Sequence, residues 1–500
     1  MSRSQISITS ADRSARSGRA AGKRRYLWAY ALLVAVPIAA AATLAALSTH
    51  TLVRATGPLA SAASTNAVDR VLVAVTAVVA LAAGAGAVAR RLGQPAVVGE
   101  LAGGVALGPT VLGAVDPDVQ HWLFPAAAMP SLTVLAQLGV ILFMFGIGTE
   151  LAPGALRRSG GRAVLIGHAS MAPALLCGMA VAWPLRGRFP SPQSGTLPFL
   201  LFIGLCFAIT AFPVLARVLT EENLIRTRIG GTGIAAAGIA DVTAWCLLAL
   251  VVAAVRQSSA GAAGAALCLV AAFAVVMVAL VRPAVARLAA WAGRSGTGTT
   301  GGGARRAALS AGLVCLVLAS GLATNAMGVH SIFGAFLAGV VMPRDNKLIK
   351  ELTGRVEGVV LWVMLPLFFM TVGLQTNLAS LTMSSWLICL IIVVIAVAAK
   401  AGGTSAAAAA VGERPRTALA LGAMMNCRGL TELIVLQLGL QLGVLDHSLF
   451  SIFVVMTLVT TAMTGPLLRW LLPPEERVVM AFGESLPNDL EPTPAFHAVG

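Results

Sequence analysis

Long apolar stretches recur along almost the whole chain, and each can cross a lipid bilayer, which takes about 20 residues of α-helix. Fourteen are found, near residues 26–48, 70–90, 96–114, 130–150, 162–185, 197–219, 229–255, 260–283, 306–325, 330–343, 357–376, 385–411, 416–441 and 449–473. Backbone polar groups inside a bilayer must be paired within the protein, so such runs fold as helices. The sequence therefore predicts an all-α polytopic membrane protein with 13–14 transmembrane helices.

Composition agrees with this prediction and excludes other classes of protein. Only 11% of the residues are charged and 58% are hydrophobic, whereas soluble domains carry about 25% charged residues. The net charge of +15 comes from basic residues at segment ends, so it indicates membrane topology and not nucleic-acid binding. The sequence contains no HExxH, no Gly-x-Ser-x-Gly and no complete dinucleotide fingerprint. We therefore expect neither an enzyme nor a bound cofactor.

The distribution of Lys and Arg predicts the orientation, because basic residues collect in cytoplasmic loops. With the amino terminus inside, 28 basic residues lie on the cytoplasmic side and only five on the other. Residues 1–25 form a basic arm, 26–48 an extra helix, and 474–500 a short tail. We expect a multi-pass protein of the cell (inner) membrane with both termini in the cytoplasm.

Two pairs of motifs recur seven segments apart, which indicates an internal repeat. They are GELAGGVALGP (99–109) with GAFLAGVVMP (334–343), and LFMFGIGTEL (142–151) with LFFMTVGLQTNL (367–378). Because the offset is odd, the two copies cross the membrane in opposite directions, as in carriers built from inverted repeats. The sequence predicts inverted five-helix units at about 96–255 and 330–473, within a transport domain at 70–473.

The sixth and thirteenth segments are each interrupted in the middle by residues that disfavour a continuous helix. The sixth contains Thr210 and Pro213, and the thirteenth contains Asn426 and Arg428. Proline alone could simply kink a helix. Two facing broken helices, however, offer carbonyl groups and half-helix dipoles to an ion at the centre of the membrane.

Asp241 and Lys400 lie at similar depths in the membrane, on the seventh and twelfth segments. A charged residue there costs about 2.5–3.5 kcal/mol on insertion scales, so it is a candidate functional residue. Removal of water disfavours the ionised carboxylate, and either a proton or a bound cation compensates for that loss. Asp241 could therefore exchange a proton for a cation, with Lys400 stabilising it between ions. The alternative is a static buried ion pair.

Three further side chains are candidates with two interpretations each. Arg428 and Glu432 are four residues apart and can pair on one helix face; they either support the site or only neutralise each other. His330, near the outer end of the tenth segment, could sense pH or be a hydrogen-bonded structural imidazole.

Five stretches of this sequence resemble the monovalent cation:proton antiporter-2 family, within the sodium/hydrogen exchanger superfamily. They are GQPAVVGELAGGVALGPTVLG (93–113), ITAFPVLARVL (209–219), GVHSIFGAFLAGVVMPR (328–344), LPLFFMTVGLQTNL (365–378) and NCRGLTELIVL (426–436). The resemblance implies a homodimer, each protomer having a core with two crossed broken helices and a separate dimerisation domain.

The resemblance also implies roles for individual residues. Thr210 and Pro213 match the first broken helix, Asp241 the aspartate that binds cation and proton, Lys400 the core lysine, and Arg428 the second broken-helix region. Many members carry Asp or Asn just before the binding aspartate, but this chain has Ala240. Lys400 is thus left to pair with Asp241 or to ionise differently, and the charge moved per cycle stays open.

The function expected from these features is exchange of a monovalent cation, Na⁺ or K⁺, for H⁺ by alternating access around Asp241, with a role in pH homeostasis. Two alternatives use the same scaffold. One is a non-transporting or channel-like membrane sensor, and the other is a proton-coupled exporter of an organic anion or metabolite. The presence of Asp241 and of both broken helices favours the exchanger.

Overall fold

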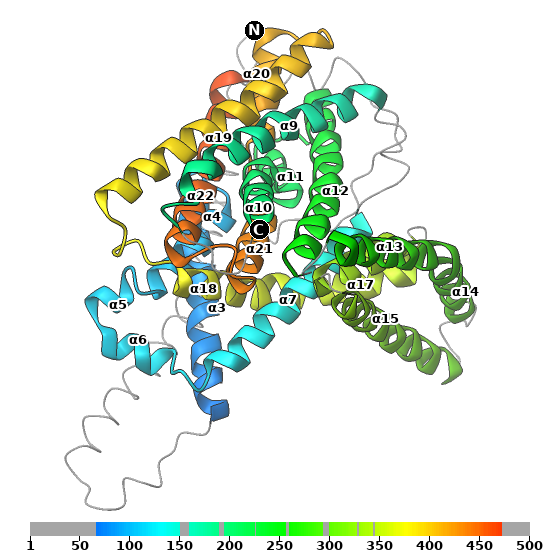
Figure 1. Ribbon diagram of the computed structural model, residues 1–500. Coiled ribbons are helices and arrows are strands. Elements are labelled where there is room, and N and C mark those ends of the chain that lie inside the picture. The colour runs from blue at the N-terminus through cyan, green and yellow to red at the C-terminus, as the bar shows by residue number, and fades with distance from the viewer. Residues whose placement is uncertain are drawn as a thin grey trace, which may run out of the picture. The chain divides into compact units, whose positions relative to one another are not determined.

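The computed structural model is helical throughout the residues that it describes (Figure 1). These are residues 67–150, 160–189, 195–225, 227–256, 260–293, 300–327, 330–343 and 346–472. The predicted basic arm at 1–25, the extra helix at 26–48 and the tail at 474–500 lie outside the described residues.

The chain divides into two compact units, Met1–Leu81 and Ala82–Gly500. The first unit is described only from residue 67, where helix α3 (Ala67–Arg91) begins. The second unit contains all the other described helices, including both broken spans. The candidate site lies entirely within this second unit.

The described residues contain 11 helices that are long and apolar enough to cross a membrane, or 12 when one bent pair is counted as a span. Uninterrupted α-helices include α7 (Met129–Glu150), α9 (Gly160–Leu185), α12 (Arg228–Arg256), α15 (Thr300–Ala326), α19 (Met383–Ala410) and α22 (His447–Leu471). The predicted segment at 330–343 is a shorter apolar helix, α16 (Ser331–Val340). The all-helical membrane architecture is confirmed.

Two spans extend beyond the predicted boundaries because π-helical turns join shorter helices. α13 (Ala260–Val276), η3 (Met277–Val281) and α14 (Arg282–Gly293) carry the segment predicted at 260–283 ten residues further. α17 (Lys347–Val359), η4 (Val360–Met364) and α18 (Leu365–Gln375) start the segment predicted at 357–376 ten residues earlier. The first turns of α17 are polar and are capped by Asn346, which accepts hydrogen bonds from the Leu348 and Ile349 amides, so a search for apolar runs misses them.

The repeated motifs pack against each other across the two predicted halves. In α4 (Ala96–Leu107), a Cβ at Gly104 would lie 2.4 Å from the Phe369 carbonyl oxygen of α18. In α16, a Cβ at Gly339 would lie 2.1 Å from the Phe145 carbonyl oxygen of α7. Each early motif therefore touches a late one through a glycine contact. This arrangement supports the inverted repeat, whose boundaries remain a prediction.

Candidate ion-binding site

The first broken span consists of α10 (Thr196–Ala208) and α11 (Phe212–Glu221), which lie between α12 and α22 in Figure 1. Ile209 and Ala211 have ψ angles of 138° and 89°, so the chain between the two half-helices is not helical. Pro213 occupies the first turn of α11, where a missing backbone donor leaves no bond unmade. The predicted interruption beside Thr210 is therefore a true break and not a kink.

The second broken span consists of α20 (Pro415–Met425) and α21 (Leu430–Gln441), which are bent by 41° relative to each other. Gly429 closes this break with a φ angle of 152°, a region that side-chain-bearing residues rarely adopt. A Cβ at Gly429 would also lie 2.8 Å from Cγ2 of Val214 in α11. Asn426, at the start of the break, is buried, and its Oδ1 has no hydrogen-bond partner.

The two breaks are hydrogen-bonded to each other. The Ala211 amide donates to the Cys427 carbonyl at 3.0 Å. The Thr210 hydroxyl donates to the Met425 carbonyl at 3.3 Å. Two interruptions that lie far apart in the sequence therefore meet at one place, as the sequence predicts.

Two buried cations satisfy the end of α10. A helix leaves its last four carbonyl groups without helical partners, and here these belong to residues 206–209. Arg428 donates to the first two carbonyls, with 2.7 Å between its Nη2 and the Phe207 oxygen. Lys400 donates to the last two, with 2.9 Å between its Nζ and the Ile209 oxygen. Both side chains are fully buried and lie at the negative end of the α10 dipole.

Glu432 balances one of these two cations. Its Oε1 lies 3.1 Å from Nη1 of Arg428, and neither side chain is exposed. The pair that their spacing predicts is therefore formed, on the first turn of α21. Oε2 of Glu432 and Nε of Arg428 have no hydrogen-bond partner.

Asp241 lies near the middle of α12 and is 1% exposed. Its Oδ2 accepts a hydrogen bond of 3.3 Å from the amide of Phe212, the first residue of α11. The carboxylate thus faces the positive end of a half-helix, a position that favours an anion. Its other oxygen, Oδ1, is buried without a hydrogen-bond partner.

The structure does not join Lys400 to Asp241. Both residues are described, and no ion pair within 4.0 Å connects them. The sequence places them at one depth, but the ammonium group of Lys400 is directed at the α10 carbonyls. The predicted direct stabilisation of Asp241 by Lys400 is not seen.

Asp241 opens onto a small cavity, which has about 10 Å³ of space, close to that needed for one water molecule. The cavity is lined by Ile209, Asp241, Ala244, Trp245, Leu248, Thr431 and Val435. The hydroxyl oxygen of Thr431 is also buried without a hydrogen-bond partner. Two residues that line this cavity, Asp241 and Thr431, therefore each carry a buried oxygen atom without a partner, and oxygen atoms are the ligands that hard cations take.

The sodium/hydrogen exchanger transmembrane family matches residues 74–473. The chain belongs to this family. It is 34% identical to the Na(+)/H(+) antiporter NhaS4 of Synechocystis sp. over 382 residues, which cover 76% of this chain and 92% of that one. It is 37% identical to Cation/H(+) antiporter 20 of Arabidopsis thaliana and 32% to K(+)/H(+) antiporter 1 of Saccharomyces cerevisiae. The matched regions cover 75% and 77% of this chain but only 45% and 44% of those longer proteins.

The fold of this family member is also found in a solved structure. The sodium proton antiporter MjNhaP1 from Methanocaldococcus jannaschii aligns with a TM-score of 0.54 and 13% identity, covering 83% of this chain and 100% of that one. The resemblance predicted from the sequence motifs is confirmed, and the family is one of transporters, not enzymes.

His330 of this exchanger lies outside the Asp241 cavity. It caps α16, where its Nδ1 accepts a hydrogen bond of 3.4 Å from the Ile332 amide. A ring nitrogen that accepts carries no proton, so this contact requires the unprotonated Nδ1. The geometry favours the structural imidazole, and pH sensing by His330 stays a prediction.

Thr431 is the residue of the site that sequence reasoning missed. It follows the second break directly, in the same stretch as Arg428 and Glu432. A threonine in a helix usually bonds the carbonyl four residues back, but the residue four back from Thr431 is Cys427, inside the break. Its position at the start of a half-helix is the signal that could have found it.

Proposed function

We propose that this protein exchanges Na⁺ or K⁺ for H⁺ by alternating access, with Asp241 binding either the proton or the cation. The observation that supports this most is the buried, unpartnered Oδ1 of Asp241, whose cavity is also lined by Thr431 with its unpartnered hydroxyl. An uncompensated carboxylate is unfavourable in such a place. A proton or a cation can neutralise it, and occupation by one excludes the other.

The remaining charges of the site have a supporting role in this proposal. Arg428 and Lys400 donate hydrogen bonds to the carbonyls at the end of α10. Glu432 partly neutralises Arg428 through their ion pair. Lys400 therefore does not compete with the cation for Asp241. The alternative of a static Asp241–Lys400 ion pair loses its support.

The cavity also suggests the stoichiometry. Ala240 is fully buried and brings no second acid, and Asp241 is the one ionisable side chain among those that line the cavity. A single carboxylate binds either one proton or one monovalent cation, so each state of the carrier moves one positive charge. We therefore propose a one-for-one, electroneutral exchange, whose rate does not change when the membrane potential is clamped.

The exchange is tested in everted membrane vesicles with a pH-sensitive dye. Na⁺ and K⁺ are added separately to an established proton gradient, because the names of the relatives include both cations. We expect cation-dependent dissipation, and Asp241→Asn should abolish it. Asp118→Asn, at an exposed position on α6 (Pro117–Leu123), is the matched control and should retain it.

Three other outcomes would contradict the proposal. A folded wild-type protein that responds to neither Na⁺, K⁺ nor Li⁺ would exclude exchange of these ions. Dissipation without any added cation would indicate a channel-like leak. Dissipation driven only by an organic anion would favour the exporter.

The orientation and assembly are also part of the proposal. The distribution of basic residues supports cytoplasmic termini in the cell membrane, and the family resemblance supports a homodimer. Accessibility labelling of single cysteines placed in the first turns of α17 and in the 186–188 loop would test the orientation. Cross-linking in the membrane would test the dimer.

A further inference from the structure

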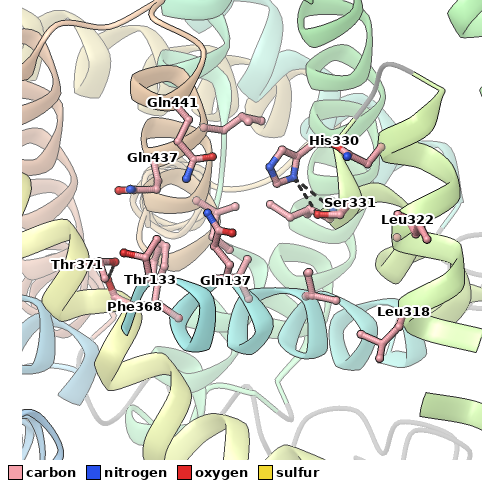
Figure 2. Close-up of a pocket in the computed structure, with 18 residues that line it drawn as sticks. Thr133, Gln137, Leu318, Leu322, His330, Ser331, Phe368, Thr371, Gln437 and Gln441 are labelled. Carbon is pink, nitrogen blue, oxygen red and sulfur yellow. Dashed lines mark hydrogen bonds between the residues drawn. The ribbon is translucent and has the colours of Figure 1, made fainter. Parts of the chain in front are cut away.

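A second, larger cavity lies in the same helical unit, and we call it the vestibule. Its volume is about 400 Å³, enough for an ion with several water molecules. Figure 2 shows its lining side chains, which come from α7, α15, α16, α18 and α21. The polar members are Thr133, Gln137, Asn325, His330, Ser331, Thr371, Gln437 and Gln441.

The vestibule wall is polar but carries no fixed charge. None of the described residues that line it is Asp, Glu, Lys or Arg. His330 is the one imidazole among the lining residues, and its Nδ1 accepts a hydrogen bond from the Ile332 amide. Arg256 reaches the rim, where it donates to Oδ1 of Asn325 at 3.3 Å. A cation in the vestibule would therefore be bound by neutral oxygen atoms.

Gln437 provides such an oxygen. Its side chain is 9% exposed, and its Oε1 is buried without a hydrogen-bond partner. Buried side-chain oxygens in proteins nearly always have a partner. Gln437 lines the vestibule, and its unpaired amide oxygen therefore points to a ligand.

The vestibule and the Asp241 cavity are neighbours along α21. Thr431 and Val435 line the Asp241 cavity, while Ile434 and Gln437 line the vestibule. Thr431 and Gln437 are six residues apart, or about 9 Å along the helix axis. Neighbouring positions of α21 thus line both cavities.

An aromatic contact between α12 and α16 also connects the linings of the two cavities. Trp245 lines the Asp241 cavity and packs edge-on against Phe333 of α16, with 5.9 Å between the ring centroids. The residue before Phe333 is Ile332, which lines the vestibule. Adjacent residues of α16 thus contact the lining of the Asp241 cavity and line the vestibule.

We propose that the vestibule is a loading site for the transported monovalent cation, where Oε1 of Gln437 replaces part of the ion's water shell before the ion reaches Asp241. This inference rests on the proposed exchange. Neutral oxygens bind a monovalent cation weakly, and a site on a transport path must be easy to leave. Protons do not compete with the cation for an amide oxygen, whereas they do compete for the Asp241 carboxylate.

The test uses proteoliposomes with a pH-sensitive dye, in which exchange is measured against Na⁺ and K⁺ concentration at several pH values. Gln437→Leu should raise the KM for the cation about 2- to 10-fold, the cost of one lost polar contact. The maximal rate and the pH profile should stay unchanged. Gln437→Glu should lower the KM at high pH and make it depend more steeply on pH, because a carboxylate can be protonated.

The matched control is Gln375→Leu. Gln375 also has a buried Oε1 without a partner, but it does not line the vestibule. An unchanged KM in both Gln437 variants would overturn the loading site, while cation-dependent exchange by the wild type would leave the Asp241 proposal intact. The loading site would also be overturned if both Gln437 variants had a lower melting temperature and a lower maximal rate at an unchanged KM. That result would indicate a structural role for Gln437.

Discussion

The two broken spans contribute to the site in different ways. The first break, at residues 209–211, has no charged side chain and presents main-chain groups, with carbonyls on one side and the Phe212 amide on the other. The second break carries Arg428, whose guanidinium satisfies carbonyls at the end of α10, just before the first break. The first span thus presents the ends of two helix dipoles, and the second supplies the charged side chain that hydrogen-bonds to one of those ends. The comparison teaches that the two broken spans use each other's polar groups to satisfy their hydrogen bonds.

The largest expected effect comes from removing the charge that connects the two breaks. Arg428→Met leaves Glu432 buried without its ion partner and two α10 carbonyls unpaired. Loss of one member of a buried ion pair costs about 3–5 kcal/mol of unfolding free energy. We expect a large fall in the apparent melting temperature of the protein in detergent, measured by size-exclusion chromatography after heating.

A double variant separates the two causes of that loss. Arg428→Met with Glu432→Leu removes both charges, so the melting temperature should recover in part, while the carbonyls remain unpaired. If the double variant were no more stable than Arg428→Met, the ion pair would not be the main source of the effect.

A smaller effect is expected where the breaks touch through Gly429. Gly429→Ala places a methyl group 2.8 Å from Val214 and forces alanine to adopt a φ of 152°. Such backbone strain costs about 1–3 kcal/mol, so the melting temperature should fall.

Two variants accompany this measurement. Val214→Ala in the Gly429→Ala background should relieve the contact but not the strain, and thus restore only part of the stability. Gly402→Ala is the control, because a Cβ there meets nothing within 4 Å on an exposed face of α19. A fall as large in Gly402→Ala would show that the effect is not specific to the break.

The smallest expected effect is on the ion ligand that the second break adds to Asp241. Thr431→Val keeps the shape of the side chain and removes the unpaired hydroxyl. We expect a KM for the transported cation about 2- to 10-fold higher, at an unchanged melting temperature. Thr460→Val is the control, since that hydroxyl bonds carbonyls of its own helix, α22; an equal change in KM there would argue against Thr431 as a ligand.

Much of this fold could be predicted from the sequence because a bilayer imposes a simple rule on segment length. That rule found each described membrane segment, while helix-disfavouring residues indicated both breaks and the cost of a charge in the bilayer singled out Asp241. It failed at the end of α14 and at the start of α17, where a helix continues beyond the predicted segment.

The contacts inside the site could not be predicted in the same way. Counting residues gives the depth of Lys400 and Asp241 but not the direction of each side chain around its helix. The sequence therefore suggested a pair, whereas the ammonium group contacts the α10 carbonyls. Thr431 and Gln437 were missed for a related reason, because only the assembled helices show which polar atoms have no partner.

The carbonyl contacts at the end of α10 have a consequence for how this protein can vary. Arg428 and Lys400 bind main-chain oxygens, which every amino acid at positions 206–209 would present equally. Substitutions there are therefore limited by the volume of the side chain alone, whereas positions 400 and 428 are limited by chemistry. A library of variants across both regions should be permissive at 206–209 to any apolar residue that fits, and intolerant of neutral residues at the two cationic positions.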